Sequence, residues 1–393
     1  MRKQLEDLMQ KTGLHIDLDK EVGELPVGDQ QRLEILKALV RGAKVLILDE
    51  PTAVLTPQET VQLFGVLKTL RDQGTTIIII THKLKEVMAL CDEVTVMRQG
   101  QVVQTESVAN TSVAQLAQAM VGRKVNIGRQ DAKTSRASDA QELLQAQQLL
   151  WRDAQGVARL NDVDVSLYAG EILGVAGVSG NGQSELLDVL CGLKTPQEGK
   201  MDLLGTNFTP SHWLNPKQAR QMGLAHVPED RYARALVMGF SAWEAAVLGY
   251  EGLPKFSRSG IMRHANMHQS TNEMMEKFDV RPRNDQLRAG SFSGGNQQKL
   301  VLARELGQYP KVLLVGQPTR GVDIGAIEFI HKQLRTMRDA GSAVLVVSSE
   351  LDEILALSDR VMVMNQGKVT GILPIEECDE IKIGLLMTGG NSP

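Results

Sequence analysis

Short apolar runs rich in β-branched residues recur along the chain, and longer segments with helical spacing separate them. Runs of this kind are typical of strands that a sheet buries on both faces. The runs lie at 45–48, 75–80, 171–177, 312–315 and 343–348, and two of the helical segments lie at 58–72 and 326–339. Strands that alternate with helices predict an α/β fold whose largely parallel sheet is covered on both faces.

Two regions depart from this rhythm. Residues 208–290 contain scattered Met, Trp and Pro, with helical spacing only in 242–251 and 265–278, and we interpret the region as a mostly helical insertion. Residues 124–141 are polar and short of large apolar side chains. This composition predicts a linker.

The pattern also repeats within the chain. The stretch 25–39 aligns with 292–306, and 45–52 aligns with 312–319. Matched residue numbers differ by 267 in both cases. A constant offset over this length indicates a duplicated domain.

The second copy is the more complete one. Met1 pairs with His268, so residues 142–267 have no counterpart in the first copy. We therefore expect the chain to be the C-terminal part of a longer two-domain protein with a truncated first domain, although a late start codon would give the same pattern. The predicted parts are a first domain over 1–123, a linker over 124–143 and a second domain over 144–390.

Composition limits the classes of function. The 393 residues have a net charge of -4, which leaves no basic footprint for nucleic acid. No apolar run approaches the ~20 residues that a membrane-spanning helix needs. The three cysteines, Cys91, Cys191 and Cys378, lack metal-ligand spacing and suggest reduced thiols in the cytosol.

A glycine-rich segment follows the predicted strand at 171–177 and precedes a helical pattern. It matches the phosphate-binding pattern G-x-x-x-x-G-K-[ST], except that Gln183 stands where lysine is expected. Backbone amides and a helix N-terminus would bind phosphate, and Ser184 would bind Mg²⁺. The predicted nucleotide-binding residues here are Gly177, Ser179, Gly180, Asn181, Gly182, Gln183, Ser184 and Glu185.

An acidic pair ends the predicted strand at 45–48. Asp49 is placed to hold Mg²⁺, and Glu50 is placed to orient or deprotonate an attacking water. In the second copy Gly316 and Gln317 occupy these positions, so both carboxylates are absent there. An acidic turn without a ligand is the alternative interpretation of Asp49 and Glu50.

A second anion-binding device is predicted at residues 292–299, FSGGNQQK. Amides and a hydroxyl at a helix start suit a terminal phosphate. The residues concerned are Ser293, Gly294, Gly295 and Asn296. The first copy has Pro26, which donates no amide, and Val27, which resists the positive φ that glycine permits.

A further candidate site residue is His82, which follows the run at 75–80. Ser349 stands at the same place in the second copy. A histidine after a strand is usually structural. Its spacing from Asp49 favours a role as a sensor of the γ-phosphate.

Together these elements resemble the nucleotide-binding subunit of ABC transporters, and more closely the fused two-domain ATPases of bacterial sugar and nucleoside importers. The resemblance covers about 1–123 and 144–390, and GVSGNGQSEL with VGDQQR favours the nucleoside type. Strings similar to those of the family are MVGR (120–123), VPEDR (227–231), QPTRGVD (317–323) and SSELDEI (348–354).

The resemblance implies ATP and Mg²⁺ as ligands and two sites, each shared head to tail by two domains. One site would combine Asp49, Glu50 and His82 with the segment 293–296 and hydrolyse ATP. The other, with Gln183 and Gly316, would hold nucleotide without turnover. Because this chain has no first phosphate loop, we expect it to be a poor ATPase alone.

The family also implies partners and a location. These are two integral-membrane permease subunits, an extracytoplasmic substrate-binding lipoprotein, no nucleic acid, and attachment to the cytoplasmic face of the membrane. In VPEDR, Glu229 stands roughly at the glutamine-loop position of the family. The alternatives are a soluble tandem ATPase of the translation-factor or repair type and a nucleotide-binding remnant without turnover.

Overall fold

The computed structural model describes residues 2–12, 14, 16–22, 25, 27–52, 57–81, 83–98, 100–122, 140–178 and 180–387. The chain divides into two compact units, Met1–Val125 and Asn126–Pro393, and each is described by itself. Most of the predicted linker, 124–143, lies outside the described residues, and its last two residues begin a strand.

The first unit has a parallel strand pair and an antiparallel hairpin. Its elements are α1 (Arg2–Thr12), α2 (Val27–Val40), β1 (Val45–Asp49), α3 (Pro57–Asp72), β2 (Thr76–Ile80), α4 (Leu84–Leu90), β3 (Glu93–Arg98), β4 (Gln101–Ser107), the 3₁₀ turn η2 (Val108–Asn110) and α5 (Val113–Val121). The core includes Leu36 of α2, Leu46 of β1 and Leu67 of α3, so helices cover one face of the β1–β2 pair.

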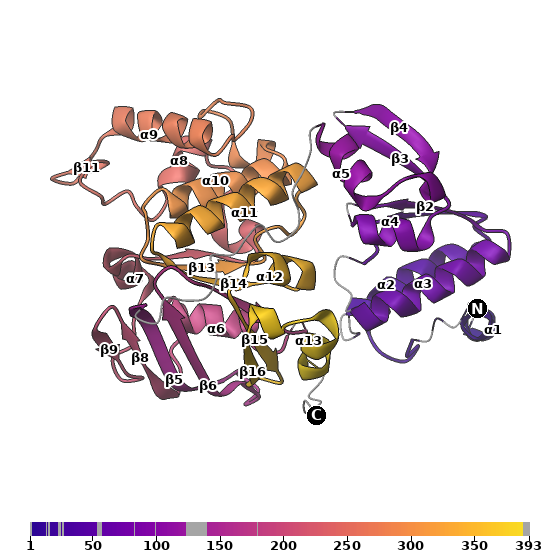
Figure 1. The fold of residues 1–393 in the computed structure, drawn as a ribbon, viewed down its shortest axis with the longest axis horizontal. Coiled ribbons are helices and arrows are strands. Elements are labelled where there is room, and N and C mark those ends of the chain that lie inside the picture. The colour runs from indigo at the N-terminus through magenta and orange to yellow at the C-terminus, as the bar shows by residue number, and fades with distance from the viewer. Residues whose placement is uncertain are drawn as a thin grey trace. The chain divides into compact units, whose positions relative to one another are not determined.

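The second unit begins with an antiparallel part and continues with alternating strands and helices (Figure 1). Up to residue 262 its elements are β5 (Glu142–Arg152), β6 (Ala158–Tyr168), β7 (Ile172–Ala176), α6 (Gln183–Leu190), β8 (Glu198–Leu203), β9 (Thr206–Phe208), α7 (Pro216–Met222), β10 (Leu224–Val227), the π-helical turn η3 (Arg231–Ala235), α8 (Ala242–Val247), β11 (Ser257–Arg258) and β12 (Ile261–Met262). The remainder comprises α9 (His264–Lys277), the 3₁₀ turn η4 (Ala289–Ser291), α10 (Gly294–Leu306), β13 (Val312–Gly316), α11 (Ile324–Asp339), β14 (Ala343–Val347), α12 (Leu351–Leu357), β15 (Arg360–Asn365), β16 (Lys368–Pro374), η5 (Ile375–Glu377) and α13 (Glu380–Met387).

The main sheet of this unit has six strands in the order β10-β13-β14-β7-β15-β16. All neighbours pair in parallel except β15 and β16, which form an antiparallel hairpin. A four-stranded antiparallel sheet, β6-β5-β8-β9, lies beside it. The predicted α/β fold with a largely parallel sheet is confirmed, whereas the antiparallel sheet was not predicted because polar residues interrupt its strands.

Alternate residues of the main sheet belong to two cores, as the pleat of a strand requires. Leu313 and Val315 of β13 pack with α8 to α11, while Val312 and Leu314 pack with α6 and the antiparallel sheet. Figure 1 shows α10 and α11 on one side of β13 and β14, and α6 with β5, β6 and β8 on the other. The sheet is therefore buried on both faces.

Two expectations about these regions are wrong. Residues 208–290 are not mostly helical, since β10 lies within them and forms an edge of the main sheet beside β13. Its four residues are too few to show a period. The strands at 45–48 and 75–80 are not buried on both faces, because every second residue of β1 is exposed and no residue of β2 is fully buried.

Candidate nucleotide-binding site

Four loops of the second unit leave the same edge of the main sheet. They follow β7, β10, β13 and β14, which are parallel to one another. Ligands of open parallel sheets bind at the carboxyl ends of the strands. This edge therefore gathers the loop at 177–184, Glu229, the pair Gly316–Gln317, and Ser349.

The glycine-rich loop has the backbone that a phosphate cradle needs. Gly182 has a φ of 103°, and a Cβ there would collide with the carbonyl oxygen of Arg159. Gly180 has a φ of 89° and open space where a Cβ would stand. Since α6 begins at Gln183, the amides of its first turn are available to an anion. Ser179 lies outside the described residues.

The side chain of Gln183 points back to the glycine-rich loop that precedes it. Its Nε2 donates a hydrogen bond to the carbonyl oxygen of Val178 at 3.1 Å, and the residue is 6% exposed. The side chain therefore braces the loop and brings no positive charge to it. A lysine at this position would add a charge pair worth about 4 kcal/mol at 4 Å and an effective dielectric near 20.

Two other predicted loop residues have protein partners. The Oδ1 of Asn181 accepts a hydrogen bond from the amide of Gln366 at 3.1 Å, which ties the loop to the β15–β16 turn. The Glu185 carboxylate lies 3.7 Å from the Nζ of Lys194. Contacts of either residue with a nucleotide stay a prediction.

The Ser184 hydroxyl donates a 2.6 Å hydrogen bond to Oε2 of Glu229. Burial raises the pKa of Glu229, although the hydrogen bond from Ser184 acts in the opposite direction. Glu229 was not among the site residues predicted from the sequence. The string VPEDR could have indicated it, but only the folded chain brings its carboxylate to the phosphate loop.

The two strand-end turns, at Glu50 and at Gln317, have the same backbone. Glu50 has a φ of 44° and donates its amide to Ile80 O at 2.8 Å; Gln317 has a φ of 47° and donates its amide to Val347 O at 2.7 Å. In the second unit, Oε1 of Gln317 accepts from both the amide and the hydroxyl of Ser349 at 3.1 Å. The matching residue in the first unit, His82, lies outside the described residues.

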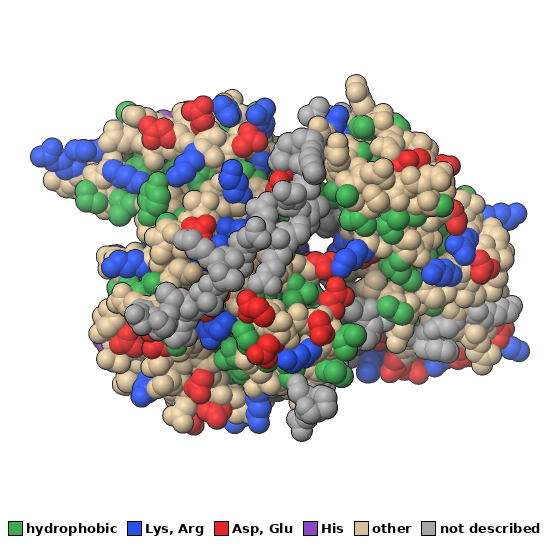
Figure 2. Space-filling model, in the orientation of Figure 1, with side chains coloured by type: hydrophobic (Ala, Val, Ile, Leu, Met, Phe, Trp, Pro, Cys, Tyr) green, Lys and Arg blue, Asp and Glu red, His purple; other side chains and the backbone are tan. Residues whose placement is uncertain are grey.

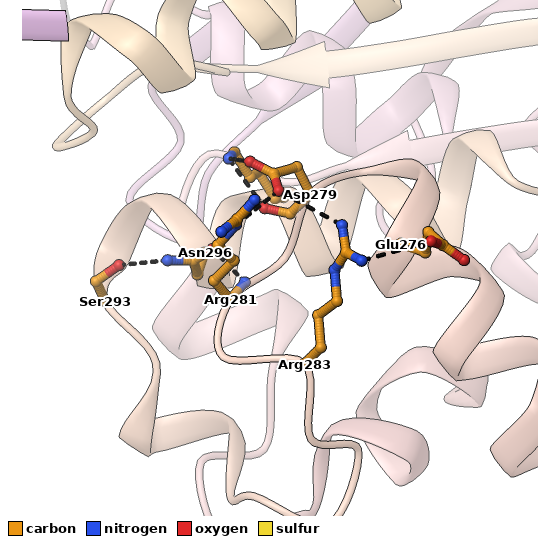
Figure 3. Close-up of polar contacts among 7 residues, drawn as sticks. Glu276, Asp279, Arg281, Arg283, Ser293 and Asn296 are labelled. Carbon is orange, nitrogen blue, oxygen red and sulfur yellow. Dashed lines mark hydrogen bonds and ion pairs between the residues drawn. The ribbon is translucent and has the colours of Figure 1, made fainter. Parts of the chain in front are cut away.

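The segment 293–296 begins a helix as predicted. Ser293 is exposed at the N-cap of α10, and its hydroxyl accepts a hydrogen bond from Nδ2 of Asn296 at 2.9 Å. Oδ1 of Asn296 accepts from the amide of Arg281 at 2.7 Å. Figure 3 shows this contact beside the ion pairs of Arg281 and Arg283 with Asp279 and of Arg283 with Glu276. The Asn296 bond ties the loop to the start of α10, and the pair with Glu276 ties it to the end of α9.

The reason given for the glycines of this segment is wrong in one respect. Gly294 and Gly295 are helical and do not have the positive φ that we invoked against Val27. A Cβ at Gly294 would lie 2.8 Å from Nη2 of Arg231, the end of a flexible side chain, and 3.1 Å from the carbonyl oxygen of Gly321, so the space at this position is tight. Val27 begins α2 in the same way, and Pro26 lies outside the described residues.

Arg231 links three loops around this helix start. Its Nη1 donates to the carbonyl oxygen of Arg320 at 2.9 Å, and its guanidinium lies against Gly294. The strings VPEDR and QPTRGVD and the helix start at 293–296 therefore meet in space, although the sequence separates them.

Surface charge is mixed over the face seen in Figure 2, where Lys and Arg side chains lie among Asp and Glu. Among the described residues, no helix combines the length and the apolar character that crossing a membrane requires.

A family model for ABC transporters matches residues 1–53 and 160–320, which is more than half of the chain. The chain belongs to the ABC transporter family. The phosphate loop at 177–184 and the helix start at 293 both lie within the matched residues. It is an ABC-type ATPase whose activity is coupled to transport, and its fold is the P-loop ABC ATPase fold.

Several relatives match almost the whole of this ABC ATPase. The nucleoside import ATP-binding protein NupA of Lactococcus lactis is 40% identical over 99% of this chain and 76% of its own length. The guanosine import ATP-binding protein NupO of Bacillus subtilis is 41% identical over 98% and 75%. The ribose import ATP-binding protein RbsA of Oceanobacillus iheyensis is 35% identical over 100% and 76%.

Solved structures match the fold at low sequence identity. The ATP-binding cassette MJ1267 of an ABC transporter has a TM-score of 0.53 and 19% identity, over 63% of this chain and 98% of its own. The archaeal ribosome recycling factor aABCE1, in complex with the ribosomal stalk protein aP1, has a TM-score of 0.67 and 19% identity, over 95% and 69%. These likenesses concern the fold alone.

Proposed function

We propose that this ABC ATPase energises the import of nucleosides, or of simple sugars, through permease subunits in the membrane. Its similarity to proteins named for nucleoside and guanosine import, at 40% and 41% identity, is the observation that carries the proposal. A relative named for glucose import, of Haloferax volcanii, is also 41% identical, and the one named for ribose import is 35% identical. Identity alone does not separate nucleosides from sugars, and nucleosides are tested first because the strings GVSGNGQSEL and VGDQQR favour that type.

One of two composite sites would hydrolyse ATP. Asp49 would hold Mg²⁺, Glu50 would orient or deprotonate water in line with the γ-phosphate, and His82 would contact that phosphate. The amides that begin α10, with Ser293 and Asn296, would stabilise the charge on the γ-phosphate from the opposite side. The exposed N-cap of α10 supports this role, because a ligand can reach it.

The other site would bind ATP without turnover. Gln317 is neutral and accepts hydrogen bonds from Ser349, so it has no basic group to offer to water. Gln183 binds its own loop and adds no charge. The glycine loop still fits a phosphate, since Gly180 and Gly182 have positive φ and the first turn of α6 presents its amides at the loop.

The residues also fit the ligands ATP and Mg²⁺. Amides at the start of α6 suit phosphate oxygens, and the hydroxyl of Ser184 with a carboxylate oxygen suits a hard cation. Bound Mg²⁺ would neutralise phosphate charge. The protein would position the nucleotide.

Transport coupling implies two permease subunits, an extracytoplasmic substrate-binding lipoprotein and a place on the cytoplasmic face of the membrane. A role without nucleic acid agrees with the net charge of -4. The alternative of a soluble tandem ATPase is favoured only by the fold likeness to aABCE1, at 19% identity. The import relatives at about twice that identity outweigh it.

The test compares two matched substitutions in the full chain. Glu50→Gln should abolish the low steady-state ATP turnover expected of the chain, because it removes the general base, whereas Gln317→Ala should leave that turnover within about twofold. The opposite pattern would reverse the assignment of the two sites. Binding of ATP without turnover by the parent chain would favour the nucleotide-binding remnant instead.

Substrate class needs a separate measurement. Uptake of a radiolabelled nucleoside and of radiolabelled ribose is compared in cells with and without this chain. Loss of nucleoside uptake alone is the expected result, and loss of ribose uptake alone would contradict the nucleoside assignment.

A further inference from the structure

The β11–β12 hairpin, with its flanking residues 255–263, exposes large apolar side chains. Ile261 is 72% exposed and Met262 is 49% exposed. In Figure 1 the hairpin extends outward from the part of the second unit that contains α8 and α9. Single exposed apolar residues are common on protein surfaces, so exposure alone does not indicate a partner. Two further features of this hairpin, its fixed shape and its charge, point to one.

The hairpin has a fixed shape despite its exposure. Its turn residues, Ser259 and Gly260, have φ of 52° and 79°, and a two-residue turn of type I′ requires positive φ at both places. At its base Phe256 is 1% exposed, and the carbonyl oxygen of this residue accepts a hydrogen bond from the amide of Arg263 at 2.8 Å. The tip is therefore held out from the unit by its base, and binding would cost little ordering of the chain.

The hairpin is also basic, in a chain whose net charge is -4. Lys255, Arg258 and Arg263 lie within it, and the sequence has no Asp or Glu from 252 to 272. Neither arginine forms an ion pair with a carboxylate of the described residues. Figure 2 shows Lys and Arg side chains at the place where Figure 1 labels β11. The hairpin is thus a local positive patch on an acidic chain.

Cationic and apolar side chains stand side by side on this hairpin. In the strand register Arg258 lies opposite Ile261, and residues directly opposite each other are neighbours on one face. The surface of an anionic membrane has the complementary chemistry, because it presents phosphates with acyl chains just beneath them. A membrane offers this pairing everywhere, whereas a protein partner would need a matching pocket that is both acidic and apolar.

We propose that the β11–β12 hairpin contacts anionic phospholipid directly, with Ile261 and Met262 entering the membrane surface and Arg258 and Arg263 binding headgroup phosphates. The proposal rests on the proposed function insofar as the chain must work at a membrane. Each cation near an anionic surface raises the affinity roughly fivefold, so three cations give about a hundredfold. A contact of this strength would orient a subunit that permeases hold, and would not anchor it alone.

The experiment measures sedimentation of the full chain with vesicles of phosphatidylglycerol and phosphatidylcholine in equal parts, without any permease. The chain should bind these vesicles, and binding should weaken as the salt concentration rises. Arg258→Gln combined with Arg263→Gln should lower the affinity at least about tenfold, because two cations are lost. Ile261→Ser should lower it by about fivefold, because less apolar area is buried in the lipid.

Matched controls change the same kinds of side chain elsewhere on the second unit. Lys200→Gln combined with Lys217→Gln removes two exposed cations, and Ile381→Ser changes an isoleucine that is 76% exposed. Both controls should bind vesicles as the parent chain does. Every one of these substitutions changes a surface side chain, so the melting temperature should stay close to that of the parent and binding losses would not reflect unfolding.

Three results would overturn the proposal. One is that the chain does not bind the vesicles, and another is that the hairpin variants bind as well as the controls. The third is a loss of binding that occurs only on membranes containing the permease subunits, because that would assign the hairpin to a protein partner.

The depth of the hairpin gives an independent measurement. Lipids with brominated acyl chains should quench the indole added by Ile261→Trp more strongly than the indole added by Ile381→Trp. Equal quenching in the two variants would show that the tip does not enter the lipid.

The result does not depend on the transported substrate, because the vesicles contain no permease. Vesicle binding through the hairpin, together with uptake that is the same with and without this chain, would contradict the proposed function and leave the lipid contact standing. Uptake that requires the chain, together with no vesicle binding, would contradict the lipid contact alone.

Discussion

Two strand pairs, β1–β2 in the first unit and β13–β14 in the second, match in sequence position and backbone. They differ in burial. Each strand of the second pair begins and ends 267 residues after its counterpart, and the parallel registers agree. On one face, Val45, Ile47, Ile78 and Ile80 are 53%, 64%, 47% and 54% exposed, whereas Val312, Leu314, Leu345 and Val347 are at most 1% exposed.

The difference lies in what the second unit adds between residues 142 and 227. Helix α6 and the antiparallel sheet cover this face, and β7 pairs with both β14 and β15. Among the described residues of the first unit, β2 pairs only with β1 and β3 only with β4. Strand formation here therefore does not require a buried environment, whereas burial depends on a distant segment.

The largest expected effect tests this contrast in stability. Leu314→Ala should lower the free energy of unfolding of the second unit by about 2–5 kcal/mol, because it leaves a cavity in a closed core. Its counterpart Ile47→Ala should cost less than about 1 kcal/mol, since most of its side chain already contacts solvent. Denaturant unfolding measures both, and similar losses would mean that the face of β1 is also covered.

A second effect concerns the acid sensitivity of the second unit. Burial lowers the pKa of His226 in β10 to about 4, against the opposing charges of Glu305 and Asp188. Below about pH 6.5 the unfolded chain binds a proton at His226, whereas the folded chain stays unprotonated there until about pH 4. The free energy of unfolding therefore falls as the pH drops from about 6.5 to about 4, by up to roughly 3 kcal/mol.

His226→Leu should flatten this part of the pH dependence of unfolding in the second unit. The same substitution should leave the first unit's unfolding transition unchanged, since β10 belongs to the second unit. An unaltered pH profile would show that His226 does not cause the acid sensitivity of this unit.

The smallest effect concerns the exposed face itself. Ile78→Lys should change the free energy of unfolding by less than about 0.5 kcal/mol and should reduce self-association in light scattering, because it breaks an exposed apolar patch. Leu345→Lys at the matching buried position is the contrast and should unfold the second unit. A large loss from Ile78→Lys would show that something packs on this face in solution.

Much of the fold was predictable because it depends on local pattern. The apolar runs at 312–315 and 343–348 are strands, and helices begin at Gln183 and Gly294 as the phosphate-binding motifs require. The antiparallel strands were missed because Gln145, Gln147 and Gln148 interrupt β5, and bulges replace a regular alternation. Strand β10 was missed because it is short.

The sequence by itself determined the strands that end at Asp49 and Gly316, where the carboxylates Asp49 and Glu50 stand, and that their counterparts Gly316 and Gln317 cannot replace them. Only the tertiary structure decided that Glu229 lies over Gly316 and bonds Ser184, and that one of two matching strand pairs is buried. Local preferences depend on neighbouring residues, whereas these features depend on contacts between segments far apart in the chain.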